Sequence, residues 1–162
     1  MKTLLILRHA KTQQDAPTGD HARELTERGL RDAAAMAPYI RTLIGTPDTI
    51  VTSDARRAMQ TAEIVSAGAG FSASVTIEPR IYGANLDTLL DVVRALPPDA
   101  DRVVLVGHNP GFEELASALS SSEAIRLPAA AFARLEFDVP AWYKVDLGAG
   151  RLRELATRHT IG

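Results

Sequence analysis

The chain has 162 residues, of which 46% are hydrophobic and 23% charged, the mixture of an ordinary globular protein of one domain. Its formal net charge of −2 gives no general attraction for nucleic acid or an anionic membrane, so any anion site must be built locally. It contains no cysteine, which excludes disulfides, thiolate catalysis and zinc–thiolate centres and suits a reducing cytoplasm.

The first predicted element is a strand at Leu4–Leu7, where a continuous apolar run indicates burial on both faces of a sheet. The run ends at Arg8 and is too short for a signal peptide. No stretch approaches the ~20 apolar residues that cross a bilayer. We therefore expect one domain over residues 1–162, in the cytoplasm, with neither a membrane nor a nucleic-acid partner.

Two helices and a strand are predicted next. After a polar loop at residues 11–24, apolar side chains recur at helical spacing from Leu30 to Ile40, with Thr26 as N-cap. Thr49 to Thr52 form a short strand. A second helix then begins, with Ser53 or Asp54 as its cap.

The rest of the chain continues the alternation before it changes character. A strand at residues 75–77 precedes a helix at residues 86–93, opened by Asn85. The apolar strand at residues 102–106 leads to a helix with Asn109 as cap and Pro110 in its first position. Beyond Pro128, apolar and polar residues alternate at 133–137, and a last strand is predicted near residues 152–156, both typical of antiparallel edges.

Strands that alternate with helices predict an α/β fold, a three-layer α/β/α sandwich with a mostly parallel central sheet and antiparallel edge strands. In such sheets, ligands bind beyond the carboxyl ends of the strands. The residues that follow the predicted strands at 4–7, 49–52 and 102–106 are Arg8-His9, residues 53–57 and residues 107–109. The topology alone selects these segments as the candidate site.

Two histidines and several arginines occur in these segments, a combination suited to phosphate. Guanidinium groups bind phosphate oxygens in pairs, and helix N-termini add N–H donors. A neutral imidazole among them can attack phosphorus and form a phosphoenzyme. Because neighbours in a strand point to opposite faces, Arg8 and His9 can converge only if the strand ends at them.

The same segments resemble a known family. Leu7-Arg8-His9-Ala10, Thr52 to Ala62 and Val106-Gly107-His108-Asn109-Pro110 are similar, in order and spacing, to the three signatures of the histidine phosphatase superfamily, and Leu25 to Gly29 match a further landmark. The branch that they most resemble is the SixA-like phosphohistidine phosphatases. The resemblance implies a fold like that of phosphoglycerate mutase.

The resemblance also implies a role for each matching residue. His9 would be the phosphorylated nucleophile, Arg8 and Arg57 would clamp the phosphoryl group, and His108 would bind it and pass a proton. Asn109 lies in the third signature and is expected to bind substrate. Arg56, the neighbour of Arg57, would be a contact at the rim.

Two positions depart from the family pattern. The usual RHG is Arg8-His9-Ala10 here, as SixA-like members tolerate, and residues 79–84 lack the glutamate acid of many small-molecule phosphatases. Glu78 is nearby, but we expect it within the strand and structural. Loss of the general acid typically lowers the rate by ~10²–10⁴-fold when the leaving group is an alkoxide, which needs a proton. A protonated phosphohistidine needs less help, because its imidazole leaves neutral. His108, or a carboxylate at residues 11–20, remains an alternative acid.

The expected activity is therefore a metal-independent phosphatase without cofactor, acting through phospho-His9 on a phosphorelay or phosphocarrier protein. One alternative is a broad phosphomonoesterase for small phosphorylated metabolites, which a carboxylate near the leaving-group side of His9 would favour. Another is a phosphate-binding interaction module without turnover. His21 and His159 are expected to be solvated, and the histidine spacing does not suggest a metal site.

Overall fold

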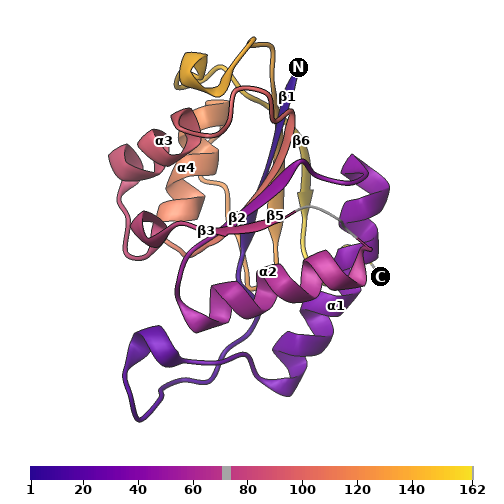
Figure 1. Ribbon diagram of the computed structural model, residues 1–162, viewed down its shortest axis with the longest axis vertical. Helices are drawn as coiled ribbons and strands as arrows, with labels where there is room; N and C mark the ends of the chain where they lie inside the picture. Colours follow the sequence, from indigo (N-terminus) through magenta and orange to yellow (C-terminus); the bar gives the residue numbers. More distant parts are fainter. Residues whose placement is uncertain (71–73, 162) are drawn as a thin grey trace.

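The computed structural model describes residues 1–70 and 74–161 and contains one six-stranded sheet (Figure 1). The strand order is β3-β2-β4-β1-β5-β6. The strands are β1 (Lys2–Arg8), β2 (Thr49–Thr52), β3 (Val75–Ile77), β4 (Arg102–Gly107), β5 (Phe132–Phe137) and β6 (Arg151–Ala156). The first four pair in parallel, and β5 and β6 are antiparallel. The predicted mostly parallel sheet with antiparallel edge strands is confirmed.

Helices cover both faces of this sheet and make the three layers. One pair, α1 (Glu27–Ile44) and α2 (Arg56–Gly68), lies on one side, and the other pair, α3 (Leu86–Arg94) and α4 (Gly111–Ser120), lies on the opposite side (Figure 1). Three short helical turns complete the fold: η1 (Asp20–Ala22), η2 (Pro79–Ile81) and η3 (Trp142–Lys144). The α/β/α sandwich predicted from the alternation is therefore present.

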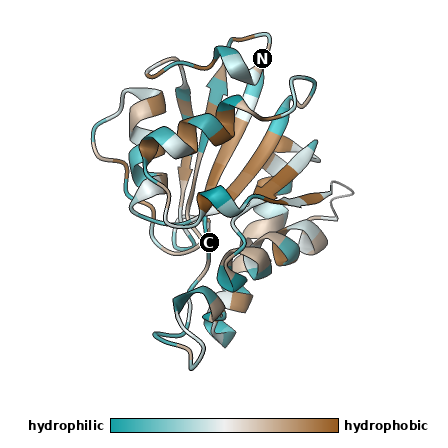
Figure 2. Cartoon of the chain, turned by 60° about the vertical axis from the view of Figure 1, so that its left-hand side comes forward, coloured by the Kyte–Doolittle hydropathy of each residue, from teal (hydrophilic) through white to brown (hydrophobic). Residues whose placement is uncertain are grey.

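Two apolar clusters fill the spaces between the layers, as the brown strands and helix faces of Figure 2 show. Strand β1 contributes to both, because Leu4 and Ile6 pack towards α3 and α4 whereas Leu5 and Leu7 pack towards α1 and α2. Each fully buried side chain of this kind contributes roughly 1.5–3 kcal/mol relative to exposure. The continuous apolar run in the sequence thus reflects a strand covered on both faces.

Helix α1 begins as predicted and buries most of the predicted stripe, namely Ala33, Ala37 and Ile40. The hydroxyl of Thr26 accepts a hydrogen bond from the Gly29 N–H at 3.1 Å, the expected N-cap. Leu30 was expected in the core and is 40% exposed. Met36, two turns further along the helix, is fully buried instead. The buried face therefore departs from the predicted stripe at these two positions.

Two other predicted caps are wrong by one or two residues. The residue before α2 is Ala55, not Ser53 or Asp54, and the residue before α4 is Pro110, not Asn109. The physical reason is that both polar side chains bind elsewhere. Ser53 contacts His108, and the Asn109 amide donates to the Leu127 carbonyl at 2.8 Å. Both side chains therefore belong to the candidate site.

No helix within the described ranges is long and apolar enough to cross a membrane.

Candidate active site

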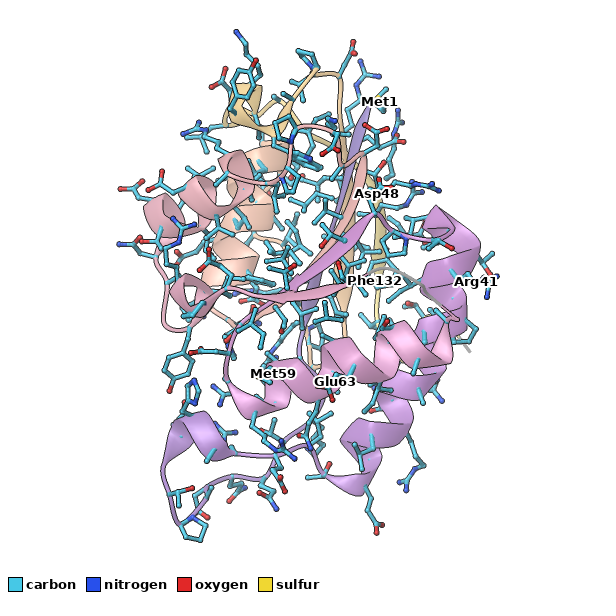
Figure 3. All side chains as sticks on the ribbon, in the orientation of Figure 1. Met1, Arg41, Asp48, Met59, Glu63 and Phe132 are labelled. Carbon is cyan, nitrogen blue, oxygen red and sulfur yellow. The ribbon has the colours of Figure 1, made fainter. Side chains whose placement is uncertain are left out.

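The carboxyl ends of three adjacent parallel strands form the site. In the sheet register, Arg8 of β1 lies beside Gly107 of β4, and Thr52 of β2 lies beside Val106. Strand β1 ends at Arg8, so the condition for Arg8 and His9 to converge is met. In Figure 3, Met1 and Asp48 mark the other end of the sheet, away from the loop that follows β1.

A pocket of about 450 Å³ opens at these strand ends. Its walls include every residue that the sequence proposed for chemistry or binding: Arg8, His9, Arg57, His108 and Asn109. The two imidazole rings lie 5.3 Å apart, centroid to centroid. Segments separated by up to about a hundred residues in the sequence therefore face one pocket.

The hydrogen bond of His9 fixes the form of its imidazole. His9 is 7% exposed, and its Nδ1 lies 2.7 Å from the carbonyl oxygen of Ala10. A carbonyl oxygen can only accept, so Nδ1 carries the proton and Nε2 keeps a lone pair. Burial, followed by the charges of His108, Arg57 and Arg8, lowers the pKa of His9 to about 3. The ring is therefore neutral at physiological pH, with a lone pair on Nε2.

His108 is held from the neighbouring strand. Its Nε2 lies 2.7 Å from the hydroxyl oxygen of Ser53, and its buried Nδ1 has no hydrogen-bond partner among the described residues. Burial, and then the charge of Arg57, lowers the pKa of His108 to about 4. A second neutral imidazole, with spare hydrogen-bonding capacity, therefore faces His9.

Two guanidinium groups add positive charge to the pocket. Arg57 is 6% exposed and donates to the carbonyl and the carboxylate of Asp20 at 2.8 and 3.1 Å. Arg8 donates to the Leu127 carbonyl at 3.1 Å. The Nε atoms of both arginines are buried without a partner in the part of the chain that the structure describes. Each of the two guanidinium groups can therefore still donate a hydrogen bond to an oxyanion.

The adjacent arginines take different positions, in the order that the motif predicts. Arg57 lines the pocket, whereas Arg56 is exposed and pairs with Glu24 at 2.9 Å. The hundred-degree step of a helix separates the two side chains. The register across the double arginine agrees with the prediction, although their catalytic roles remain predictions.

The rest of the second signature fastens α2 to the segments around His9. The buried hydroxyl of Thr61 accepts from the Ala10 N–H at 3.1 Å and donates to the Arg57 carbonyl at 2.8 Å. The amide oxygen of Gln60 accepts from the Leu25 N–H at 2.8 Å. These side chains set the distance between His9 and Arg57, which explains why the signature extends beyond Arg57.

The landmark at the start of α1 has a steric cause. A Cβ atom on Gly29 would lie 2.1 Å from the carbonyl oxygen of Lys11, far inside van der Waals contact. The same carbonyl accepts a hydrogen bond from the Thr26 N–H at 3.0 Å. Glycine at this position lets the loop after His9 lie directly against the helix.

The family model of the histidine phosphatase superfamily, branch 1, matches residues 4–89, more than half of the chain. The chain belongs to this superfamily. An uncharacterized protein of Mycobacterium tuberculosis is 31% identical over 115 residues, which are 71% of this chain and 70% of the relative. The family match covers His9 and Arg57, and His108 lies beyond it.

Solved structures of similar proteins agree with this membership. A protein from Nakamurella multipartitia, assigned as the phosphohistidine phosphatase SixA, is 30% identical, with a TM-score of 0.82 over 96% of this chain and 95% of that chain. A protein histidine phosphatase SixA complexed with tungstate has a TM-score of 0.85 over 99% of both chains at 21% identity, a likeness of fold. The SixA-like branch suggested by the motifs is confirmed.

In this histidine phosphatase, Tyr82 and its contact with Asp20 were not predicted from the sequence. The Tyr82 hydroxyl donates to the Asp20 carboxylate at 2.6 Å, and its ring packs edge-on against His108 at 5.6 Å. Hydrogen bonds from Tyr82, Arg23 and Arg57 hold the pKa of Asp20 well below its usual range. The only signal in the sequence was an acidic residue in the loop after β1.

Two further expectations need correction. Glu78 lies just after β3 rather than within it, and its carboxylate accepts from the Arg80 N–H and pairs with the Arg80 guanidinium at 2.8 Å. Its structural role stands, because it caps η2. His21 is exposed as expected, but it also pairs with Asp54 at 3.0 Å and packs against the Tyr82 ring.

Across residues 1–70 and 74–161, no group of three or more His, Asp or Glu side chains is arranged to hold a metal ion.

Proposed function

We propose that the chain is a phosphohistidine phosphatase in which His9 accepts the phosphoryl group. One observation carries this proposal: the Nδ1 of His9 is committed to the Ala10 carbonyl, which leaves the Nε2 lone pair of a pocket residue free to attack phosphorus. The membership in the superfamily and the similarity to SixA structures support the same activity.

The reaction proceeds in two balanced steps. In the first, Nε2 of His9 forms a bond to phosphorus while the bond from phosphorus to the protonated imidazole of the substrate breaks, so that this imidazole leaves neutral. In the second, water attacks the phosphorus and the bond to Nε2 breaks. Phosphate leaves with the protons of the water, and His9 regains its lone pair. No side chain has to supply a proton to the leaving group.

The remaining pocket residues stabilise charge in both steps. The guanidinium groups of Arg8 and Arg57 line the pocket and donate to the equatorial oxygens, on which negative charge is concentrated in the transition state. The imidazole of His108 lines the same pocket and binds these oxygens. Asn109 binds at the edge of the phosphoryl group, next to His108. Two guanidiniums in a half-enclosed pocket provide the stabilisation that metal ions give in other phosphoryl-transfer enzymes.

The chemistry of the pocket favours phosphohistidine on a protein over a phosphate ester. No glutamate occurs at residues 79–84, and the tyrosine of that segment, Tyr82, donates to Asp20 rather than to the pocket. The lowered pKa keeps Asp20 ionised, so this carboxylate accepts hydrogen bonds and cannot protonate an alkoxide. A substrate whose leaving group departs as a neutral imidazole suits such a site.

The second candidate is a phosphomonoesterase for small metabolites, and the carboxylate of Asp20 in the pocket is the observation in its favour. The two candidates differ in the substrates that they turn over. The phosphohistidine phosphatase should act on a phosphorylated histidine peptide and on aryl phosphates, which have good leaving groups. It should act on alkyl phosphates about 10²–10⁴-fold more slowly, for want of a general acid. Equal rates for alkyl and aryl phosphates would favour the esterase.

A labelling experiment tests the proposal directly. The protein is incubated with phosphoramidate, a reactive donor with a P–N bond, and acid-labile, base-stable phosphate is mapped by mass spectrometry. We expect label on His9 and none in His9→Ala, while the matched variant His159→Ala labels as the wild type does. A strong chelator should leave labelling unchanged. Labelling of His108, or none with phosphate still bound, would refute the mechanism and favour a non-catalytic binding module.

A further inference from the structure

A second hollow lies next to the pocket of His9 and is lined by basic side chains. It has a volume of about 150 Å³, continues into a hollow of about 280 Å³, and is bounded by eight residues: Lys11, Arg28, Asp32, Pro128, Ala129, Thr157, Arg158 and His159. We call these residues the basic cleft. Lys11 and Ala129 line both the basic cleft and the pocket, so the two lie side by side.

The basic cleft carries more positive charge than its own carboxylate can neutralise. Asp32 is the acidic residue of its lining and lies 3.3 Å from Arg158 and 3.7 Å from Arg28. Lys11 adds a third cation. The Nε of Arg158 is buried and makes no hydrogen bond within the described residues. The single carboxylate of Asp32 is shared between Arg158 and Arg28, so the basic cleft keeps a net positive charge that a ligand carboxylate can neutralise.

The backbone around the basic cleft holds these side chains in place. Thr157 and Thr160 close a turn after β6 through two hydrogen bonds, in which each N–H donates to the hydroxyl of the other, at 2.8 and 3.3 Å. This turn presents Arg158. On the other side, the Lys11 carbonyl rests against Gly29 in the first turn of α1, beside Arg28. The positive charges are thus built into two fixed segments.

The reach of the basic cleft indicates what kind of substrate uses it. A small phosphate ester fits within the pocket, where Arg8, Arg23 and Arg57 face one carboxylate, that of Asp20. A group in the basic cleft must belong to a substrate that extends past Lys11, beyond the phosphoryl group. The combined surface concentrates positive charge on a chain whose net charge is −2.

We propose that the basic cleft binds aspartate or glutamate side chains that flank the phosphorylated histidine of a protein substrate. This inference rests on the proposed function and adds the sequence context of its substrate. Ion pairs of this exposure contribute about 0.2–1 kcal/mol each, so two arginines should favour an acidic context by about 2–30-fold. The preference should weaken with salt, because exposed charges are screened.

Two matched histidine peptides, phosphorylated with phosphoramidate, provide the test. One carries aspartates on both sides of the histidine, and the other carries asparagines. We expect the wild type to have a kcat/KM about 2–30-fold higher for the acidic peptide, with the preference lost as NaCl rises from about 50 mM to about 500 mM. Equal values for the two peptides at low salt would overturn the proposal.

Variants locate the preference. Arg28→Glu and Arg158→Glu should abolish or reverse it, and Arg28→Gln and Arg158→Gln should reduce it. The matched control Arg151→Glu, at the far end of β6, should retain it. Turnover of p-nitrophenyl phosphate should be unchanged in all five. A preference that survives in both glutamate variants, with their unfolding midpoints unchanged, would place the binding elsewhere and refute the basic cleft.

A binding measurement separates this proposal from the proposed function. The unphosphorylated peptides, labelled with a fluorophore, should bind the wild type with the same acidic preference, even if no peptide is dephosphorylated. Loss of turnover with intact preference would count against the catalytic proposal alone. An oligonucleotide of equal charge that bound more tightly through Arg28 and Arg158 would identify a nucleic acid as the occupant and refute an acidic peptide.

Discussion

The two ends of the parallel sheet treat buried polar groups in opposite ways. At the amino end, Lys2 is 3% exposed and donates to the Pro98 carbonyl at 2.6 Å and to Asp101 at 2.9 Å. The carboxylate of Asp48 accepts from the N–H groups of Asp101 and Arg102 at 2.8 and 2.9 Å. The groups of this end bind one another.

At the carboxyl end, by contrast, several buried polar atoms make no hydrogen bond within the described residues. Four buried atoms of the pocket lack a partner among the described residues: Nε of Arg8, Nε of Arg57, Nδ1 of His108 and Oδ1 of Asn109. An unsatisfied buried polar group costs about 1–3 kcal/mol. The comparison teaches that stability is gained at the amino end, whereas the carboxyl end gives up stability by leaving three ring or guanidinium nitrogens and one amide oxygen of its pocket residues unpaired among the described residues.

The largest expected effect is on turnover, at the carboxyl end. Arg57→Ala should lower kcat/KM with the histidine phosphopeptide by about 10²–10³-fold, because a buried donor to the transferred phosphoryl group is lost. The neighbouring variant Arg56→Ala should change it by less than about 3-fold, since this exposed side chain only pairs with Glu24. Steady-state kinetics of the two variants decide the point. Equal losses of kcat/KM in the two variants would contradict the placement of Arg57 in the pocket and of Arg56 at its rim.

A smaller effect, on stability, is expected at the amino end. Lys2→Met keeps the buried stem but removes both hydrogen bonds of the ammonium group, so the free energy of unfolding should fall by about 1–3 kcal/mol. Turnover should stay unchanged. Urea unfolding, followed by circular dichroism, measures the change, and Lys144→Met, at an exposed position, is the control. A lysine variant that lost activity without losing stability would contradict the division between the two ends.

The sequence predicted the parts of the molecule that follow from strand order. His9, Arg57 and His108 lie within one or a few residues of strand ends, and parallel strands bring such residues together whatever the loops do. Asp20 and Tyr82 could not be found in this way. Their contact depends on the path of two loops, which no periodic pattern describes.

The predicted caps of α2 and α4 were wrong for a related reason. Ser53 and Asn109 have the residue types and positions of N-caps, and local propensity predicted that use. In the folded chain, each side chain finds a tertiary partner, His108 for Ser53 and the Leu127 carbonyl for Asn109. Residues diverted from a local role towards the pocket are therefore a sign of the site that becomes visible only after folding.

The smallest expected effect is the pH dependence of stability, which measures the effect of burying the neutral His9 at the carboxyl end. The pKa of His9 is lowered from 6.5 to about 3, chiefly by burial, so the unfolded chain binds a proton between these values that the folded chain does not. Protonation then favours unfolding. The stability associated with His9 is complete above pH 6.5 and declines as the pH falls towards about 3.

Between pH 7 and pH 5, this decline should amount to about 1–2 kcal/mol for His9 alone. His9→Asn removes the titrating group while its amide can still donate to the Ala10 carbonyl, so the variant should lose about that much less stability over the same interval. His159→Asn, at an exposed position, is the control and should follow the wild type. Urea unfolding at the two pH values gives the difference. Parallel curves for wild type and His9→Asn would mean that His9 is hydrated and protonates freely, and the neutral nucleophile would be lost with it.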